Sequence, residues 1–207
     1  MSKYEYTWDA HKVTTDDGYI LTTFRITGNK NDNFIRPTYP TPRPPVLIQH
    51  CDFGDGASWM EDIDGLPMQL QLVEAGYDVW IGSNRGTEYS RGHTSLAGGD
   101  PRYWAFSWAE MGIYDDVANI KKVKEVSGAR KVFYIGYSQG TTQMFYALAH
   151  KNLEEEFFAD SLHKFVALAP CTVSAQDVDG EDWYYDNLYK YRDAGIHSIG
   201  GPDWEMN

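Results

Sequence analysis

Residues 136–140 read Gly-Tyr-Ser-Gln-Gly and match the pattern G-x-S-x-G, which suits nucleophilic chemistry by Ser138. The pattern requires the serine to lie at a sharp turn between a strand and a helix, with its hydroxyl exposed above a sheet. Gly136 and Gly140 would let the strand and the helix approach without a side-chain clash. Five residues with three fixed positions recur by chance, so the alternative is an ordinary turn serine. The β-branched and aromatic run 132–135 before the motif, and the helical spacing after it, favour the nucleophile.

An acyl-transfer reaction also needs two backbone N–H groups that face the developing oxyanion. Gln139, directly after the serine, is the candidate for the first group. The second must come from a loop after an earlier strand, and residues 49–53 follow the apolar run 46–49. We expect His50 in this loop to hydrogen-bond the backbone and to take no part in proton transfer, because a base must be positioned against the serine.

The hydrophobic pattern predicts the elements that position these residues. Strands alternate with amphipathic helices, which indicates parallel βαβ units in a sheet covered on both faces. A turn signal at residues 16–18 predicts an antiparallel hairpin at the N-terminus. We expect strands at 4–13, 19–26, 46–49, 77–81, 131–135 and 165–168, helices at 66–75, from Ile113 to near Gly128 and after Ser138, and loops at 29–45 and 82–108.

Several segments together resemble the acid lipase family, which includes gastric and lysosomal acid lipases. The matching segments follow the family's order and cover nearly the whole chain up to Thr172; they are residues 11–21, 45–50, 75–86, 89–93, 104–111 and 136–142. The resemblance implies an α/β-hydrolase fold with a Ser-His-Asp triad beneath a mobile cap. It also implies hydrolysis of fatty-acyl esters such as triacylglycerols or cholesteryl esters, without a metal or organic cofactor, in a protein that is secreted or lysosomal.

The resemblance assigns the nucleophile to Ser138, one oxyanion donor to Gln139 and the other to Asp52, with His50, Gly136 and Gly140 as supporting residues. The chain departs from the family at Cys51 and Asp52, where the family has a small, apolar His-Gly-Leu-like sequence. The donor is a backbone N–H, so Asp52 can serve. Its carboxylate would repel a nearby oxyanion unless it points away or is protonated.

The triad acid and histidine are not expected in this chain, because in this fold both follow the nucleophile after further strands. The histidines after Ser138 are His150, His163 and His197, and none has the expected position. We therefore interpret residues 1–173 as the N-terminal part of the hydrolase core, truncated before its last strands, and residues 174–207 as the beginning of the cap. The alternative is a non-catalytic lipid-binding or interaction protein derived from this fold, whose open sheet edge a partner would cover.

The formal net charge of −12 argues against nucleic acid and against electrostatic docking on anionic membranes. No apolar run approaches the roughly 18 residues of a membrane span, so only transient contact with a lipid interface is expected. The N-terminus carries no apolar signal segment, and no Cys/His spacing resembles a metal site. Cys51 and Cys171 could form one disulfide or none.

Charged and aromatic residues in the long loop favour structural roles over contact with a substrate. Ion pairs of Arg85 and Glu110 are expected to hold the loop. Trp104, Phe106 and Trp108 are expected to pack in the core, with an acyl pocket as the alternative. The sequence thus predicts an α/β fold whose chemistry centres on Ser138.

Overall fold

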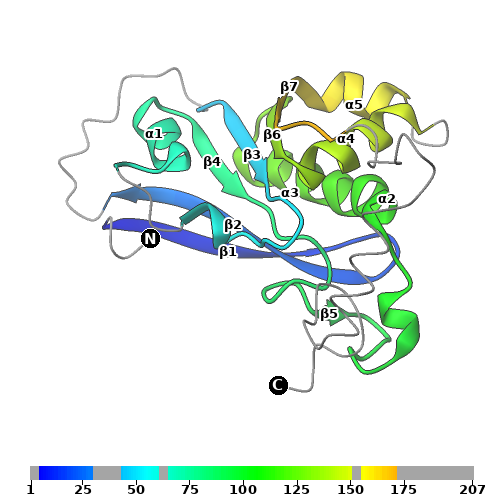
Figure 1. Cartoon of the computed structure of the whole chain (residues 1–207). Coiled ribbons are helices and arrows are strands. Elements are labelled where there is room, and N and C mark those ends of the chain that lie inside the picture. Colours follow the sequence, from blue (N-terminus) through cyan, green and yellow to red (C-terminus); the bar gives the residue numbers. More distant parts are fainter. Residues whose placement is uncertain (1–4, 30–42, 61–64, 151–154, 172–207) are drawn as a thin grey trace, which may run out of the picture.

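The computed structural model describes residues 5–29, 43–60, 65–150 and 155–171 (Figure 1). Its strands form one sheet in the order β1-β2-β4-β3-β6-β7, with the short strand β5 paired to β2. The strands are β1 (Tyr6–Thr14), β2 (Tyr19–Asn29), β3 (Pro45–Gln49), β4 (Asp78–Ile81), β5 (Gly92–His93), β6 (Val132–Tyr137) and β7 (Leu162–Leu168).

The N-terminal hairpin is antiparallel, and the rest of the sheet is mostly parallel. β1 and β2 pair with Val13 opposite Leu21, and Gly18 in the turn between them has a φ of +101°, which a side chain would strain. β2 also pairs antiparallel with β4. β3 pairs in parallel with β4 and β6, and β6 pairs in parallel with β7. The predicted fold class is therefore confirmed.

Helices cover both faces of this sheet (Figure 1). Alternate residues of β3 show why, since Val46 and Ile48 lie in one core cluster with α1, while Leu47 lies in a second cluster with α3 and α4. Side chains alternate across a strand, so a strand that is apolar at every position requires cover on both sides. The helices are α1 (Met68–Glu74), α2 (Trp108–Glu110), α3 (Val117–Ser127), α4 (Gln139–Ala149) and α5 (Glu155–Ser161).

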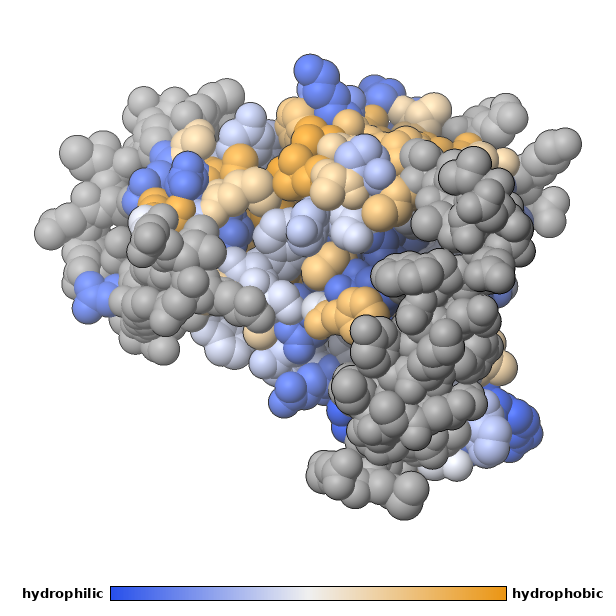
Figure 2. Space-filling view, viewed as in Figure 1, coloured by the Kyte–Doolittle hydropathy of each residue, from blue (hydrophilic) through white to orange (hydrophobic). Residues whose placement is uncertain are grey.

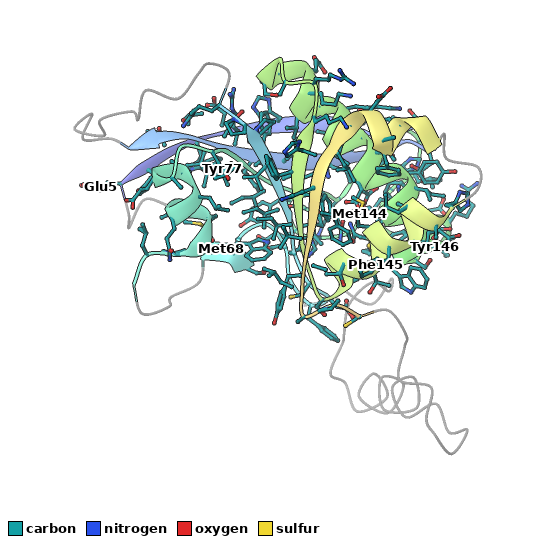
Figure 3. All side chains as sticks on the ribbon, turned by 90° about the horizontal axis from the view of Figure 1, so that it is seen from above. Glu5, Met68, Tyr77, Met144, Phe145 and Tyr146 are labelled. Carbon is teal, nitrogen blue, oxygen red and sulfur yellow. The ribbon has the colours of Figure 1, made fainter. Side chains whose placement is uncertain are left out.

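Side chains on α4 show the same division into inner and outer positions. Met144 is fully buried in the second cluster, whereas Phe145 is 37% exposed. Figure 3 shows Met144 among the buried side chains, with Phe145 and Tyr146 lying toward the outer side of α4.

The long loop packs against the N-terminal hairpin in a third core cluster, formed by Val13, Tyr19, Leu21 and Tyr103. Tyr103 is fully buried beside Tyr19, and Trp104 and Phe106 pack against this cluster. The expectation of core packing therefore holds for Trp104 and Phe106. The expectation is wrong for Trp108, which is 40% exposed and contacts the ring of Tyr146 edge-on, with 5.3 Å between the ring centroids. The loop also includes β5 and the 3₁₀ turn η3 (Pro101–Trp104).

The helix predicted from Ile113 begins earlier, at Trp108, because Ser107 and Glu110 form a capping box. The Glu110 carboxylate accepts hydrogen bonds from the Ser107 N–H at 2.7 Å and from its hydroxyl at 2.8 Å. The prediction of an ion pair at Glu110 is therefore wrong for the described residues, because its carboxylate caps a helix. A π-helical turn, η4 (Met111–Asp116), joins α2 to α3, which ends at Gly128 with a φ of +72° as predicted.

Some predictions fall outside the described residues: the cap region 174–207, His197 and most of the Pro-rich loop. Among the helices that the structure describes, none is both long enough and apolar enough to cross a membrane. The described residues also contain no cluster of three His, Cys, Asp or Glu side chains that could hold a metal ion.

Candidate active site

Ser138 lies in a strained turn between β6 and α4. Its φ of 51° and ψ of −115° are unusual for a residue other than glycine. Such strain persists only where the surroundings hold the backbone in place. The Ser138 N–H donates to the Leu168 carbonyl of β7 at 3.0 Å, and the Thr141 N–H donates to the Ser138 carbonyl at 2.8 Å. The neighbouring strand and the first turn of α4 therefore hold the serine.

Gly136 and Gly140 are required by contacts that a side chain would prevent. A Cβ atom on Gly136 would overlap the Gly140 carbonyl, so α4 could not begin so close to β6. A Cβ atom on Gly140 would lie 2.7 Å from the Gln49 carbonyl oxygen and 2.8 Å from that of His50. Gly140 therefore brings the Ser138 turn against the end of β3, where the proposed oxyanion loop begins.

His50 is buried, and the backbone engages both of its ring nitrogens. Nε2 accepts from the Asn84 N–H at 3.0 Å, so Nδ1 carries the proton and donates to the Cys51 carbonyl at 2.7 Å. Burial lowers the pKa of His50, which keeps the ring neutral. His50 has the backbone hydrogen bonds expected from the sequence and fixes the start of the loop.

The remaining predicted site residues lie on either side of this junction. The Asp52 carboxylate accepts from the Phe53 N–H at 3.1 Å, and Phe53 has a φ of 60° and an exposed ring. The Gln139 side-chain amide donates to the Met111 sulfur at 3.2 Å. The carboxylate of Asp52 is thus tied into its own turn, and the side chain of Gln139 is directed toward η4.

The segment after β7 lies against the Ser138 turn, which the sequence did not suggest. The Cys171 N–H donates to the Thr141 hydroxyl at 3.0 Å, and the Thr142 hydroxyl donates to the Cys171 carbonyl at 2.7 Å. The Cys171 sulfur consequently lies 3.8 Å from the Ser138 hydroxyl. No disulfide joins Cys171 to Cys51.

No histidine in the described part of the chain is hydrogen-bonded to the Ser138 hydroxyl. His163 lies near the start of β7, roughly 16 Å along the strand from Leu168, whose carbonyl contacts the Ser138 turn. His150 follows the end of α4, roughly 18 Å along the helix from Ser138. Neither can accept the serine proton in this arrangement.

A buried network of amide side chains links the Ser138 turn to His50. The Asn84 amide donates to Gln143 Oε1 at 3.0 Å, and the Gln49 amide donates to Asn84 Oδ1 at 2.7 Å. The Asn84 backbone N–H is the donor to His50. Asn84 and Gln49 lie just after or at the ends of parallel strands, where polar side chains converge. That position was the only sequence signal for this network.

Arg85 holds the long loop, as predicted, through two ion pairs, of which the pair with Asp115 is fully buried. Its guanidinium lies 2.7 Å from Asp115 and 2.6 Å from Asp17, and it stacks over the Tyr19 ring at 3.9 Å. Burial raises the pKa of Asp115 to about 6, against the opposing attraction of Arg85. Three elements therefore meet at one cation: the β1–β2 turn, the loop after β4 and η4.

A mostly parallel sheet with a strained serine between β6 and α4 defines the class of hydrolase that uses such a turn. The family profile described as alpha/beta hydrolase fold matches residues 44–195, and the profile described as partial alpha/beta-hydrolase lipase region matches residues 1–63. The chain belongs to the α/β-hydrolase family, in agreement with the resemblance found in its sequence.

Curated relatives of this chain are lipases. It is 39% identical over 170 residues to lipase member K of Mus musculus, an alignment that covers 82% of this chain and 41% of the relative. It is 36% identical over 202 residues to lipase lipl-3 of Caenorhabditis elegans, with 97% and 48% covered. It is 35% identical to gastric triacylglycerol lipase of Bos taurus, with 82% and 41% covered. The chain thus spans less than half the length of these relatives.

An esterase from Pyrococcus furiosus has a similar solved structure, with a TM-score of 0.53 at 16% sequence identity. The alignment covers 93% of this chain and 63% of the esterase. At this identity the likeness concerns the fold alone.

Proposed function

We propose that this chain carries the nucleophile and the oxyanion loop of a serine ester hydrolase that cleaves fatty-acyl esters, such as triacylglycerols or cholesteryl esters. The observation that carries the proposal is the strained backbone of Ser138 between two glycines that cannot accept a side chain. A turn serine without a reaction would have no need of this strain, which is typical of functional sites.

In the proposed reaction the Ser138 hydroxyl oxygen attacks the ester carbonyl carbon while a histidine takes the hydroxyl proton. The backbone N–H groups of Gln139 and Asp52 stabilise the negative charge on the former carbonyl oxygen. The alcohol leaves with the proton from the histidine, and water then hydrolyses the acyl-serine. The position of Gly140, in contact with the carbonyls of Gln49 and His50, supports a shared site for the two donors.

We place the proton-accepting histidine and its acid outside this chain. Both nitrogens of His50 are engaged by backbone groups, and His150 and His163 lie far from Ser138 along their elements. The chain also spans only 41–48% of the length of its lipase relatives, which leaves room in those proteins for further strands.

Aromatic surface beside the serine supports an apolar substrate. The Tyr137 ring, directly before Ser138, is 42% exposed and contacts Trp59 with 6.0 Å between the ring centroids. Phe53, in the loop after His50, is 63% exposed. Such side chains gain free energy when an acyl chain covers them. By analogy with the lipase relatives, we propose a secreted or lysosomal protein that contacts lipid interfaces transiently.

Labelling with a fluorophosphonate probe tests the proposal, with imidazole added as a base from solution. We expect slow labelling of the folded chain, because the proposed histidine base lies outside it and a positioned general base increases the rate by roughly 10²–10⁴-fold. The rate should increase with imidazole concentration, and mass spectrometry should find the adduct on Ser138. Ser138→Ala should abolish the adduct.

Ser95→Ala is the matched control, because Ser95 is an exposed loop serine on the same chain. Its labelling should equal that of the unchanged protein. A folded chain that stays unlabelled at high imidazole, or one labelled equally in Ser138→Ala, would contradict the proposal and favour the non-catalytic alternative.

A further inference from the structure

Asp116 is a fully buried carboxyl group that forms no ion pair with any described residue. It lies at the end of η4, one residue after Asp115, which already shares Arg85 with Asp17. Its hydrogen-bond partners are the Tyr134 hydroxyl, 3.1 Å from each carboxyl oxygen, and the Gln143 amide at 2.8 Å. An ionised carboxylate in such surroundings is costly, and the group takes up a proton instead.

The number of protons available for hydrogen bonds around Asp116 also favours its neutral form. The Tyr134 hydroxyl has one proton but two possible acceptors, Asp116 and the Gly140 carbonyl at 3.0 Å. A protonated Asp116 can donate to the Tyr134 oxygen, which leaves the phenol proton for Gly140. An ionised Asp116 would compete with Gly140 for that proton. The neutral acid is therefore the form that satisfies all three groups.

Burial raises the pKa of Asp116 well above its usual value. The Gln143 amide opposes this shift, while the negative charge of Asp115 adds to it. The groups that face Asp116 from the packed elements are Tyr134 of β6 and Gln143 of α4. Behind Asp115 lie the charges of Arg85 and Asp17.

The partners of Asp116 reach both halves of the candidate site. Tyr134 contacts the Gly140 carbonyl in the first turn of α4, close to Ser138. Gln143 accepts from the Asn84 side chain, and the Asn84 N–H holds His50 at the start of the oxyanion loop. One carboxyl group thus lies at the junction of two hydrogen-bond paths.

We propose that Asp116 retains its proton at neutral pH and acts as a positioning residue, which aligns the Ser138 turn through Tyr134 and the His50 loop through Gln143 and Asn84. The positioning role rests on the proposed function of Ser138, whereas the protonation does not. Asp116→Asn should preserve the arrangement, because an amide donates to Tyr134 and accepts from Gln143 as the neutral acid does. Asp116→Ala should disrupt it.

The protonation also predicts a dependence of stability on pH. An Asp has a pKa of about 3.9 in the unfolded chain. Burial raises the pKa of Asp116 in the folded chain. Its contribution to stability is therefore complete below the unfolded pKa of about 3.9 and is lost as pH rises toward the folded pKa. Asp115 causes a similar loss of stability up to about pH 6, both in the unchanged protein and in Asp116→Asn. Above pH 6, the unfolding constant of the unchanged chain should rise up to about tenfold per pH unit relative to Asp116→Asn.

Infrared spectroscopy of the chain with ¹³C-labelled aspartate tests the protonation directly at pH 8, where Asp115 is ionised. We expect a protonated-carboxyl band in the unchanged protein that is absent from Asp116→Asn. Urea unfolding between pH 6 and pH 9 should show the predicted divergence of the two proteins. A spectrum with ionised carboxylates only would overturn the proposal, and this measurement needs no variant to fold.

The ring ¹⁵N chemical shifts of His50 test the positioning role. They should be the same in the unchanged protein and in Asp116→Asn, and they should change in a folded Asp116→Ala. Unchanged His50 shifts in Asp116→Ala would overturn the role. These measurements do not use Ser138 reactivity, so a failure of the proposed function would appear separately, in the labelling experiment.

Discussion

At the scale of single residues, Ser138 and Gly140 show how a short motif depends on contacts far away in the sequence. Ser138 has a backbone conformation that costs on the order of 1–3 kcal/mol for a residue with a side chain. The packing of Gly140 against the end of β3 helps to hold it, since that contact positions α4. The glycine is therefore needed for its small volume, to let two backbones meet.

Gly140→Ala should lower the free energy of unfolding by about 1–3 kcal/mol, because the new methyl group would press on two backbone carbonyls that cannot rotate away. Urea denaturation measures this change. Gly28→Ala in β2 is the control, since its Cβ would meet only the Thr7 hydroxyl at 3.8 Å. Equal losses in the two variants would show that the close approach at Gly140 has no special cost.

At the scale of elements, Arg85 joins three segments that the sequence separates. Its guanidinium pairs with Asp17 of the β1–β2 turn and with Asp115 of η4, and its own N–H donates to Asp115 at 2.9 Å. A buried ion pair adds little net free energy, but the loss of one partner leaves a charge without compensation. A change at Arg85 alone would therefore disturb the contact between all three segments.

Arg85→Met should destabilise the protein by about 3–5 kcal/mol, because Asp115 would lose the cation that compensates its buried charge. Thermal or urea unfolding at pH 7 measures the loss. Arg130→Met should cause little measurable change, since Arg130 and Asp160 form an exposed pair at 3.7 Å. A small effect of Arg85→Met would mean that the aromatic packing around the guanidinium holds the loop by itself.

At the scale of the whole molecule, β7 pairs only with β6 among the described strands. Val166 of β7 is 41% exposed, and Phe145 and Leu148 of the nearby α4 are also exposed. Figure 2 shows hydrophobic residues gathered in the part of the surface where β7 and α4 lie in Figure 1. An exposed strand edge with apolar side chains can pair with another chain.

We expect copies of this chain to associate through the β7 edge at high concentration, and Val166→Lys should weaken this association, because a charge on the strand opposes pairing between copies. Sedimentation velocity over a range of concentrations would measure the effect. Val126→Lys on α3 is the control, since Val126 is exposed at 36% but lies on a helix. If both substitutions act equally, net charge is the cause and the β7 edge has no special role.

Local patterns predicted much of the fold because the elements differ in the spacing of their apolar residues. The boundaries shifted where another interaction decided them, as at Ser107, whose hydrogen bonds with Glu110 start the helix at Trp108. β7 begins three residues before the expected Phe165, because Leu162 and Lys164 pair with β6 through backbone groups. Backbone pairing does not depend on side-chain hydrophobicity, so the pattern could not reveal it.

The sequence by itself determined the α/β fold class, the family and the serine turn, because alternating apolar periods and the G-x-S-x-G motif act locally. The sequence also indicated that Asp116 would be buried, although we did not use this signal. Asp116 lies three residues after Ile113 and four before Ile120, on the apolar face of the helix predicted from Ile113. Only the tertiary structure decided which polar groups meet: Asp116 with Tyr134, and Asn84 with His50. Hydrogen bonds between distant segments depend on distances of a few ångströms, which sequence spacing does not specify.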